Sequence, residues 1–251
     1  MLLCFLSIFM SCKNDKSADD QAKQTAANDS LPVNSATKSQ IDALPGIESE
    51  NTAGQAAAIP NDALIFGMKK STVVWIGSKS TGSTHTGFIS GKSGKIAYKD
   101  GNIVAGTVDI DMNSLVCNDL AGADKAKIEK HLKSDEFFDV AKFPTAKFDI
   151  IKISELDANT QRTASVKSIV QLTNVMTGNL TIKGISRSVT VPVNIHITAN
   201  TAQITSSMFT INRSDWGIKY DLGTVSGAVK EAIVDDKISL QLSFEGVKAA
   251  K

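Results

Sequence analysis

Three histidines and one cysteine are the side chains of residues 63–251 best suited to metal binding or nucleophilic chemistry. They are His85, His131, His196 and Cys117. Zinc sites commonly pair His or Cys ligands that lie only a few residues apart along the chain. None of these four residues lies that close to another His or Cys. The spacing therefore predicts no metal site.

A cysteine nucleophile needs a base within reach, a third group that orients the base, and donors that stabilise an oxyanion. Cys117 and His131 are a conceivable nucleophile and base. However, no strained turn, donor cluster or orienting group is recognisable beside them. We therefore predict a binding protein and no enzyme, and a hydrolase would need a catalytic group that the sequence does not display. Cys117 and His131 are interpreted as packing residues, and His196 as a surface residue.

One short helix is predicted around residues 123–132, so that it ends inside the segment HLKSDEFFDVAKFPTAKFD, residues 131–149. Charged residues separate the apolar positions, which gives the helix one apolar face. These positions are Ala123, Ala126, Ile128, His131 and Leu132. Pro144 cannot lie inside a helix and pushes Phe143 towards extended geometry. The chain is therefore expected to continue as a strand over residues 145–153.

Elsewhere the apolar residues alternate with polar ones, which is typical of antiparallel strands with one buried face. The clearest inward sets are Val189, Val191, Val193, Ile195 and Ile197; Ile238, Leu240, Leu242 and Phe244; and Val104, Val108, Ile110 and Met112. Tight turns are predicted at residues 90–92, 99–101 and 183–185, where glycine supplies a positive φ. The pattern predicts about eight strands, but it does not separate a barrel from a sandwich.

Several motifs in order identify a resemblance to a known family. Residues 131–148 contain His-Leu-Lys-Ser-Asp-x-Phe-Phe-Asp followed by Phe-Pro-x-Ala-x-Phe. The flanking motifs are Trp75, Gly77, Lys79, Gly82, His85 and Gly87; DIDMNS at residues 109–114; GNLTIKG at residues 178–184; and INRSDWGI at residues 211–218. Over residues 63–248 the chain resembles the YceI family of polyisoprenoid-binding, lipocalin-like proteins.

The resemblance implies an all-β fold, an eight-stranded antiparallel lipocalin-like barrel with one short helix covering an end. Phe137, Phe138 and Phe143 would pack the chain as it returns from the helix. It also implies that a long polyisoprenoid or isoprenoid quinone binds inside the barrel, with no other cofactor. By alternation, the residues expected to line such a tunnel are Trp75, Phe88, Val108, Ile110, Phe148, Ile150, Leu180, Ile182, Val193, Ile195, Phe209, Leu240 and Leu242. Plain core packing is the alternative for each of them.

Two polar residues are candidates for contact with the ligand's head group. Arg213 lies in an otherwise apolar strand end, so it needs a partner. It either forms an ion pair with Asp215 or Asp221 that fixes the turn, or anchors a pyrophosphate or quinone head group. His85 lies between Gly82 and Gly87 and matches a position of the family pattern.

The first residues indicate export and membrane attachment. Residues 1–12, MLLCFLSIFMSC, are apolar and too short to span a bilayer, so we interpret them as a signal peptide. Their end resembles a bacterial lipoprotein cleavage site, which would make Cys12 the lipidated residue. An ordinary signal peptide with an incidental cysteine is the alternative. The expected location is the bacterial cell envelope, on the periplasmic side or in the outer membrane.

Residues 13–62 contain no aromatic residue and are predicted to be a disordered linker. They are acidic, whereas residues 63–251, the expected barrel domain, are mildly basic, and the chain's net charge is only +1. The excess of basic over acidic residues in residues 63–251 is too small to indicate nucleic-acid binding. The expected partners are an isoprenoid lipid and the membrane. A homodimer is possible, and the sequence does not decide whether one forms. The alternative function is a structural or interaction lipoprotein whose barrel is filled by its own side chains.

Overall fold

The computed structural model describes residues 52–156, 171–219 and 234–250. Within these residues no helix is long and apolar enough to cross a membrane. Cys12 and most of the predicted linker lie outside them. The elements in chain order are β1 (Leu64–Lys79), β2 (Thr84–Lys99), β3 (Asn102–Asp111), η1 (Met112–Ser114), β4 (Val116–Cys117), α2 (Gly122–Lys133), β5 (Thr145–Glu155), β6 (Asn174–Ile182), β7 (Ile185–Ile197), β8 (Thr201–Ser206), β9 (Phe209–Asn212), η2 (Arg213–Trp216) and β10 (Val234–Lys248).

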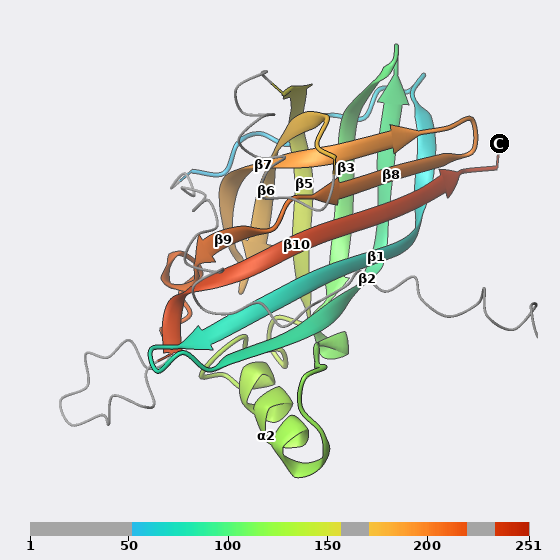
Figure 1. Ribbon diagram of the computed structural model, residues 1–251. Helices are drawn as coiled ribbons and strands as arrows, with labels where there is room; N and C mark the ends of the chain where they lie inside the picture. Colours follow the sequence, from blue (N-terminus) through green and yellow to red (C-terminus); the bar gives the residue numbers. More distant parts are fainter. Residues whose placement is uncertain (1–51, 157–170, 220–233, 251) are drawn as a thin grey trace, which may run out of the picture. The chain divides into compact units, whose positions relative to one another are not determined.

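Eight of these strands close into an antiparallel barrel (Figure 1). Their order is β1-β10-β8-β7-β6-β5-β3-β2, and pairing between β1 and β2 closes the ring. The two short strands are additions to this ring. Strand β4 pairs with β2, and β9 pairs with residues 237–240 of β10, whereas β8 pairs with residues 243–247 of the same strand. The predicted eight-stranded antiparallel barrel is confirmed, including the strand that begins directly after Pro144.

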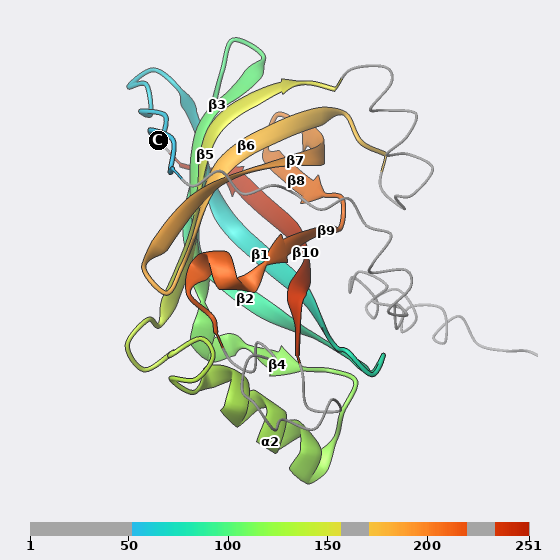
Figure 2. The same ribbon diagram turned by 90° about the vertical axis from the view of Figure 1, so that its left-hand side faces the viewer.

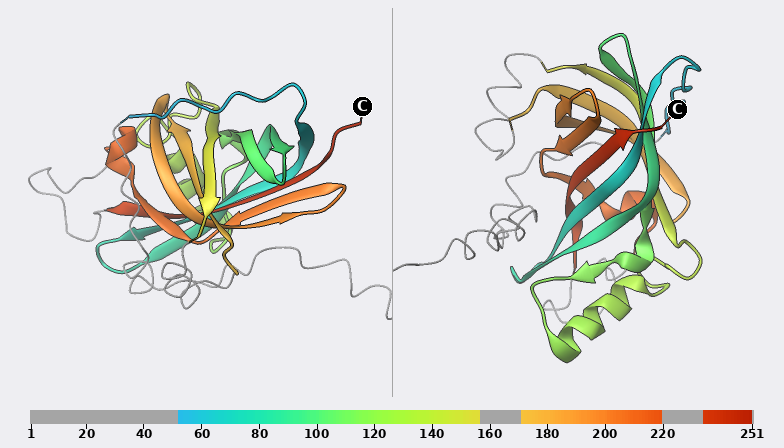
Figure 3. Two further views of the ribbon diagram at one scale, coloured as in Figure 1. Left: turned by 90° about the horizontal axis from the view of Figure 1, so that it is seen from above. Right: turned by 90° about the vertical axis from the view of Figure 1, so that its right-hand side faces the viewer.

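The predicted helix is α2, which lies across one end of the barrel together with β4 (Figures 2 and 3). The chain returns from it through a loop that packs on itself. Phe137 is buried there, and its ring lies 5.0 Å from that of Phe138. Lys183 Nζ donates to the carbonyl oxygen of Phe137 at 2.8 Å, which ties the loop to the β6–β7 turn. The third predicted packing residue, Phe143, is only partly buried beside that turn.

The alternation of buried residues is confirmed along β7 and β10 and is interrupted on β3 and β2. Val104 was predicted to face inward, but it is the extra residue of a β-bulge between the Ala97–Ala105 and Tyr98–Ile103 pairs, so Ile103 faces the core instead. The turn predicted at residues 90–92 is also wrong. There β2 continues through a second bulge opposite β3.

The other two predicted turns are confirmed. Asp100 and Gly101 have φ values of 50° and 85°, and Lys183 and Gly184 have values of 50° and 74°. Positive φ at both central residues is what the tightest hairpin turns require. These turns fix the register of β2 against β3 and of β6 against β7.

The last residues of the predicted linker contact the barrel. The backbone of Gly54 exchanges two hydrogen bonds with the buried Asn179 side chain on β6, at 2.9 and 2.7 Å. Asp62 forms an ion pair with Lys99 at 2.8 Å. Residues 52–62 therefore lie along the barrel surface.

Candidate functional site

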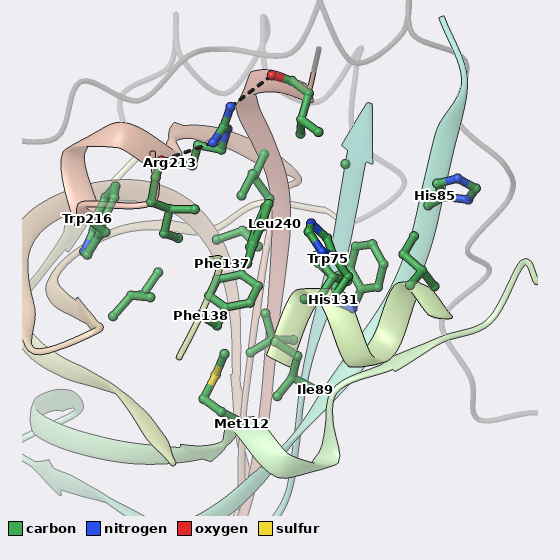
Figure 4. Close-up of a pocket in the computed structure, with 18 of the residues that line it drawn as sticks. Trp75, His85, Ile89, Met112, His131, Phe137, Phe138, Arg213, Trp216 and Leu240 are labelled. Atoms are coloured by element: carbon green, nitrogen blue, oxygen red, sulfur yellow. Dashed lines mark hydrogen bonds between the residues drawn. The ribbon is translucent and has the colours of Figure 1, made fainter. Parts of the chain in front are cut away.

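A cavity of about 830 Å³ occupies the half of the barrel interior that faces α2 (Figure 4). Its walls are side chains from seven strands and from the chain around η1 and η2. Most of these side chains are apolar, and in the barrel wall they are Val73, Trp75, Ile89, Ile110, Met112, Ala146, Leu180, Ile182, Ile211, Trp216, Ile218, Val234, Ile238, Leu240 and Leu242. The volume lies within the range of about 300 to 1,000 Å³ usual for ligand pockets.

Aromatic side chains close the deep end of the cavity. Ile110 and Ala146 line it and are paired across β3 and β5, and the next inward pair on these strands is Val108 with Phe148. On β10 the next inward residue after Leu242 is Phe244, whose ring lies 6.2 Å from that of Phe148. Both rings are fully buried and do not line the cavity. The barrel is thus hollow towards α2, and this cavity ends at the two rings.

Helix α2 covers the open end with an apolar face that remains incompletely buried. None of its twelve residues is buried. Ile128 and Leu132 line the cavity, as does Phe138 just after the helix. A surface helix normally buries its apolar stripe against a core. Here the stripe borders empty space, which an apolar ligand would fill.

Charged residues gather around the mouth of the cavity and are of both signs. The lysines are Lys79, Lys127 and Lys130, and the acids are Asp124, Glu136 and Asp235. The Asp235 carboxylate accepts a hydrogen bond from Ser78 at 2.8 Å, which joins β10 to β1 at the rim. The interior is apolar and the rim is polar, an arrangement suited to a molecule with a long apolar part and a polar end.

The structure brings together six of the thirteen residues predicted to line a tunnel. They are Trp75, Ile110, Leu180, Ile182, Leu240 and Leu242. The other seven do not line the cavity. Of these, Val108, Phe148, Ile150, Val193 and Phe209 are buried in packed core, Ile195 packs partly against that core, and Phe88 is partly exposed.

Ile89, the residue after Phe88, shows why the inward face of β2 was predicted wrongly. Phe88 pairs with Val74, whereas Ile89 pairs with Val73 and lines the cavity with it. Phe88 and Ile89 are consecutive apolar residues, so alternation does not reveal which one faces inward. Met112 was predicted to face inward but was not named as a tunnel residue, and Ile211 and Trp216 were not named either, although each belongs to a motif that the sequence displays.

Two tryptophans form opposite parts of the cavity wall, and they are the only two in the chain (Figure 4). Trp216 is fully buried, and its indole N–H donates to the carbonyl oxygen of Leu180 at 3.0 Å. The ring of Trp75 lies over Gly87, where a Cβ atom would come within 2.5 Å of it. The Trp75 indole nitrogen is buried and has no hydrogen-bond partner among the described residues.

Arg213 lines the cavity, but its guanidinium group binds backbone and side-chain oxygens of the protein itself. Its side chain is fully buried and donates to the carbonyl oxygens of Asp235, Ile218 and Val234 at 3.0, 3.1 and 3.0 Å. It also pairs with Asp236 at 3.2 Å. The ion pair was expected with Asp215 or Asp221. The described ion pair is the one with Asp236, and Asp221 lies outside the described residues, so a pair with Asp215 or Asp221 stays a prediction. These contacts indicate that Arg213 fixes the chain on both sides of residues 220–233.

His85 lies apart from Arg213, on the β2 side of the cavity (Figure 4). Its Nδ1 lies 2.9 Å from Asp119 Oδ2. The other carboxylate oxygen of Asp119 accepts from the Cys117 thiol at 3.1 Å and from the Thr86 backbone N–H at 2.8 Å. The two predicted head-group residues therefore do not converge. His131 contacts Glu136 and Phe137, and His196 is exposed, as expected from its place on β7.

The pKa values of this cluster follow from its burial and hydrogen bonds. Burial raises the pKa of the Cys117 thiol, and its hydrogen bond to Asp119 acts in the same direction. Burial alone would raise the pKa of Asp119 as well. The hydrogen bonds from Thr86, Cys117 and His85 outweigh it, so the pKa of Asp119 lies below its usual value. In the absence of a further ligand, the thiol is protonated and the carboxylate is ionised at neutral pH.

Known proteins resemble this chain along most of the barrel. A UPF0312 protein of Shewanella denitrificans is 28% identical over 165 residues, which cover 62% of this chain and 70% of that protein. A second UPF0312 protein, from Pseudomonas paraeruginosa, is 28% identical over 161 residues, with the same coverage of both chains.

Two solved structures resemble the fold. A polyisoprenoid binding domain from Saccharophagus degradans, implicated in plant cell wall breakdown, matches with a TM-score of 0.51 and 14% identity, over 74% of this chain and 99% of that one. BcnA of Burkholderia cenocepacia matches with a TM-score of 0.48 and 18% identity, over 70% of this chain and 95% of that one. The family model of the YceI-like domain matches residues 67–246, well over half of the sequence. The chain therefore belongs to the YceI-like domain family.

Proposed function

We propose that the protein binds a long-chain polyisoprenoid or isoprenoid quinone lipid, with the prenyl chain in the barrel cavity and the polar end at the mouth. The observation that carries this proposal is the apolar cavity of about 830 Å³ under a helix whose apolar residues are left incompletely buried. The solved neighbour from Saccharophagus degradans is itself a polyisoprenoid binding domain, which supports the same ligand class.

The energetics favour such a ligand. Each buried CH₂ group contributes about 0.8 kcal/mol, so a five-carbon isoprene unit gains roughly 4 kcal/mol before the costs of association. The wall needs few polar contacts to bind it. The alternative role, a structural or interaction protein with a filled barrel, would require side chains in the space that the cavity occupies.

We further propose that the protein acts as a membrane-tethered carrier or sensor in the bacterial cell envelope. The support is the sequence Phe9-Met10-Ser11-Cys12, which resembles a lipoprotein cleavage site, followed by a linker without aromatic residues. A lipidated Cys12 would keep the cavity close to the membrane that holds its ligand.

Tryptophan fluorescence provides the test, because both tryptophans of the chain line the cavity. The full chain is titrated with a long polyprenol and, separately, with an isoprenoid quinone. We expect a saturable change in emission with one ligand per chain for at least one of them. A linear, unsaturable response to both would contradict the proposal.

Two alanines allow a matched pair of variants. Ala146 lines the cavity, whereas Ala202 is fully buried in packed core. Ala146→Leu extends into the cavity, and if it displaces two methylene contacts it should weaken binding about tenfold. Ala202→Leu should instead overpack the core and lower the free energy of unfolding by about 1 to 3 kcal/mol, with ligand affinity retained. Equal affinity losses in the two folded variants would argue against binding in the cavity.

A further inference from the structure

The residues His85, Cys117 and Asp119 form a cluster that their positions in the sequence do not suggest. The antiparallel pairing of β2 with β4 sets Gly87 opposite Cys117. The same register brings His85, two residues before Gly87, next to Asp119, two residues after Cys117. One ligand atom from each of the three residues lies within 4.8 Å of the other two. Within the described residues no other group of this kind is found.

We propose that these three side chains bind a divalent zinc ion. Imidazole nitrogen, thiolate sulfur and carboxylate oxygen are the three side-chain ligand types that zinc prefers. Ligands that are 2.0 to 2.3 Å from one tetrahedral ion stand roughly 3 to 4 Å apart. At present His85 Nδ1 lies 2.9 Å from Asp119 Oδ2, and Cys117 Sγ lies 3.1 Å from Asp119 Oδ1. Small side-chain movements would therefore make room for the ion.

The proton and charge balance of binding is simple. Without metal, Asp119 accepts hydrogen bonds from its two neighbours. On binding, the Cys117 S–H bond and the His85 Nδ1–H bond both break. The thiol proton passes to solvent, and the Nδ1 proton is exchanged through solvent for one on Nε2, so that Nδ1 of the neutral ring binds the ion. One thiolate and one carboxylate then neutralise the two positive charges of Zn²⁺. No electron is transferred.

The surroundings are those of a supported and accessible site. The Thr86 backbone N–H holds the Asp119 carboxylate, and Glu129 of α2 accepts the Cys117 backbone N–H at 2.9 Å, which fixes two ligands from behind. His85 and Asp119 keep 26% and 29% of their side-chain surface exposed. An ion can therefore enter, and water can complete a fourth coordination position. A bound ion would join β2 to the segment that leads into α2, at the edge of the cavity.

Cobalt substitution and zinc competition test this proposal without reference to lipid. The untagged full chain is stripped with EDTA and titrated with Co²⁺, whose thiolate complexes show a charge-transfer band in the near ultraviolet. Zinc affinity is then measured by competition with a chromogenic chelator. We expect one ion per chain, a thiolate band that Zn²⁺ abolishes, and a melting temperature that rises with Zn²⁺ and falls back with EDTA.

The variants assign the binding to these residues. Cys117→Ser should remove the band, which also distinguishes this thiol from Cys4 and Cys12. His85→Ala and Asp119→Ala should weaken zinc affinity at least about tenfold, and the exposed His196→Ala should leave it unchanged. Circular dichroism checks the fold of each variant. Cys117 is fully buried, so its replacement could disturb folding. The His85 side chain is partly exposed, so His85→Ala is the variant least expected to disturb folding. A band that persists in Cys117→Ser, or zinc affinity that is equal in wild type and folded His85→Ala, would overturn the proposal.

Discussion

Replacing Arg213 by methionine should destabilise the barrel far more than it affects ligand binding. The guanidinium is fully buried and donates to three backbone carbonyl oxygens. Hydrogen bonds to charged groups contribute about 1.5 to 3 kcal/mol each, but such losses are not additive. The half-exposed partner Asp236 adds little. Breaking a buried, hydrogen-bonded charge typically costs about 3 to 5 kcal/mol, and we expect a loss in this range.

Urea denaturation measures the effect, with the free energy of unfolding taken from the midpoint and slope. Arg213→Lys keeps the charge but has no planar fork to reach three carbonyls, so it should still cost about 2 kcal/mol or more. Arg187→Met is the control, because Arg187 is only partly buried, and its loss should be smaller than that of Arg213→Met. A loss below about 1.5 kcal/mol for Arg213→Met together with abolished ligand binding would refute the reasoning. That result would make Arg213 a head-group anchor.

Two further predictions concern the packing around Phe148 and the proposed lipidation of Cys12. Gly178→Ala should lower the free energy of unfolding by about 1 to 3 kcal/mol, because its Cβ would lie 2.4 Å from the Phe148 ring. Gly67→Ala, with nothing within 4 Å of the new atom, should change it little, and a neutral Gly178→Ala would contradict the packing described. Cys12→Ala should leave the barrel folded but release the protein from the membrane fraction, as measured by fractionation and immunoblotting. Retention in the membrane pellet would exclude lipidation of Cys12 as the anchor.

The sequence predicts the strands well because regular strands bury alternate residues, whereas the closed barrel was expected only from the resemblance to the YceI family. Val189, Val191 and Val193 are all buried, as their spacing indicates. The predictions fail where the backbone breaks its period. Val104 is the extra residue of a β-bulge, and no local feature of the sequence marks that bulge. At Phe88 and Ile89 two apolar residues are adjacent, and only the pairing of β2 with β1 decides which one faces inward.

The candidate cavity was harder to predict than the barrel. Alternation identifies residues that face the interior, but it does not tell how deep along the axis the interior is filled. Ile110 lines the cavity, whereas Val108, two residues earlier on the same face, lies at the packed floor with Phe148. The difference depends on where large rings from separate strands meet. That depth is a property of the assembled barrel.

The His85, Cys117 and Asp119 cluster was missed for a related reason. Reasoning from spacing alone looks for ligands close together in sequence, and His85 lies far from the other two along the chain. The pairing of β2 with the two-residue strand β4 brings them together. So short a strand has too little periodicity to be predicted.

Native mass spectrometry of the full chain, purified from its source cells in mild detergent, tests directly whether the barrel cavity binds an isoprenoid lipid. We expect a population heavier than the protein by one ligand, which is released on collisional activation and identified after organic extraction as an isoprenoid lipid. Ala146→Leu, purified in parallel, should carry less of it. A protein that carries no isoprenoid, or that retains as much of it when Ala146 is leucine, would contradict binding in the barrel cavity.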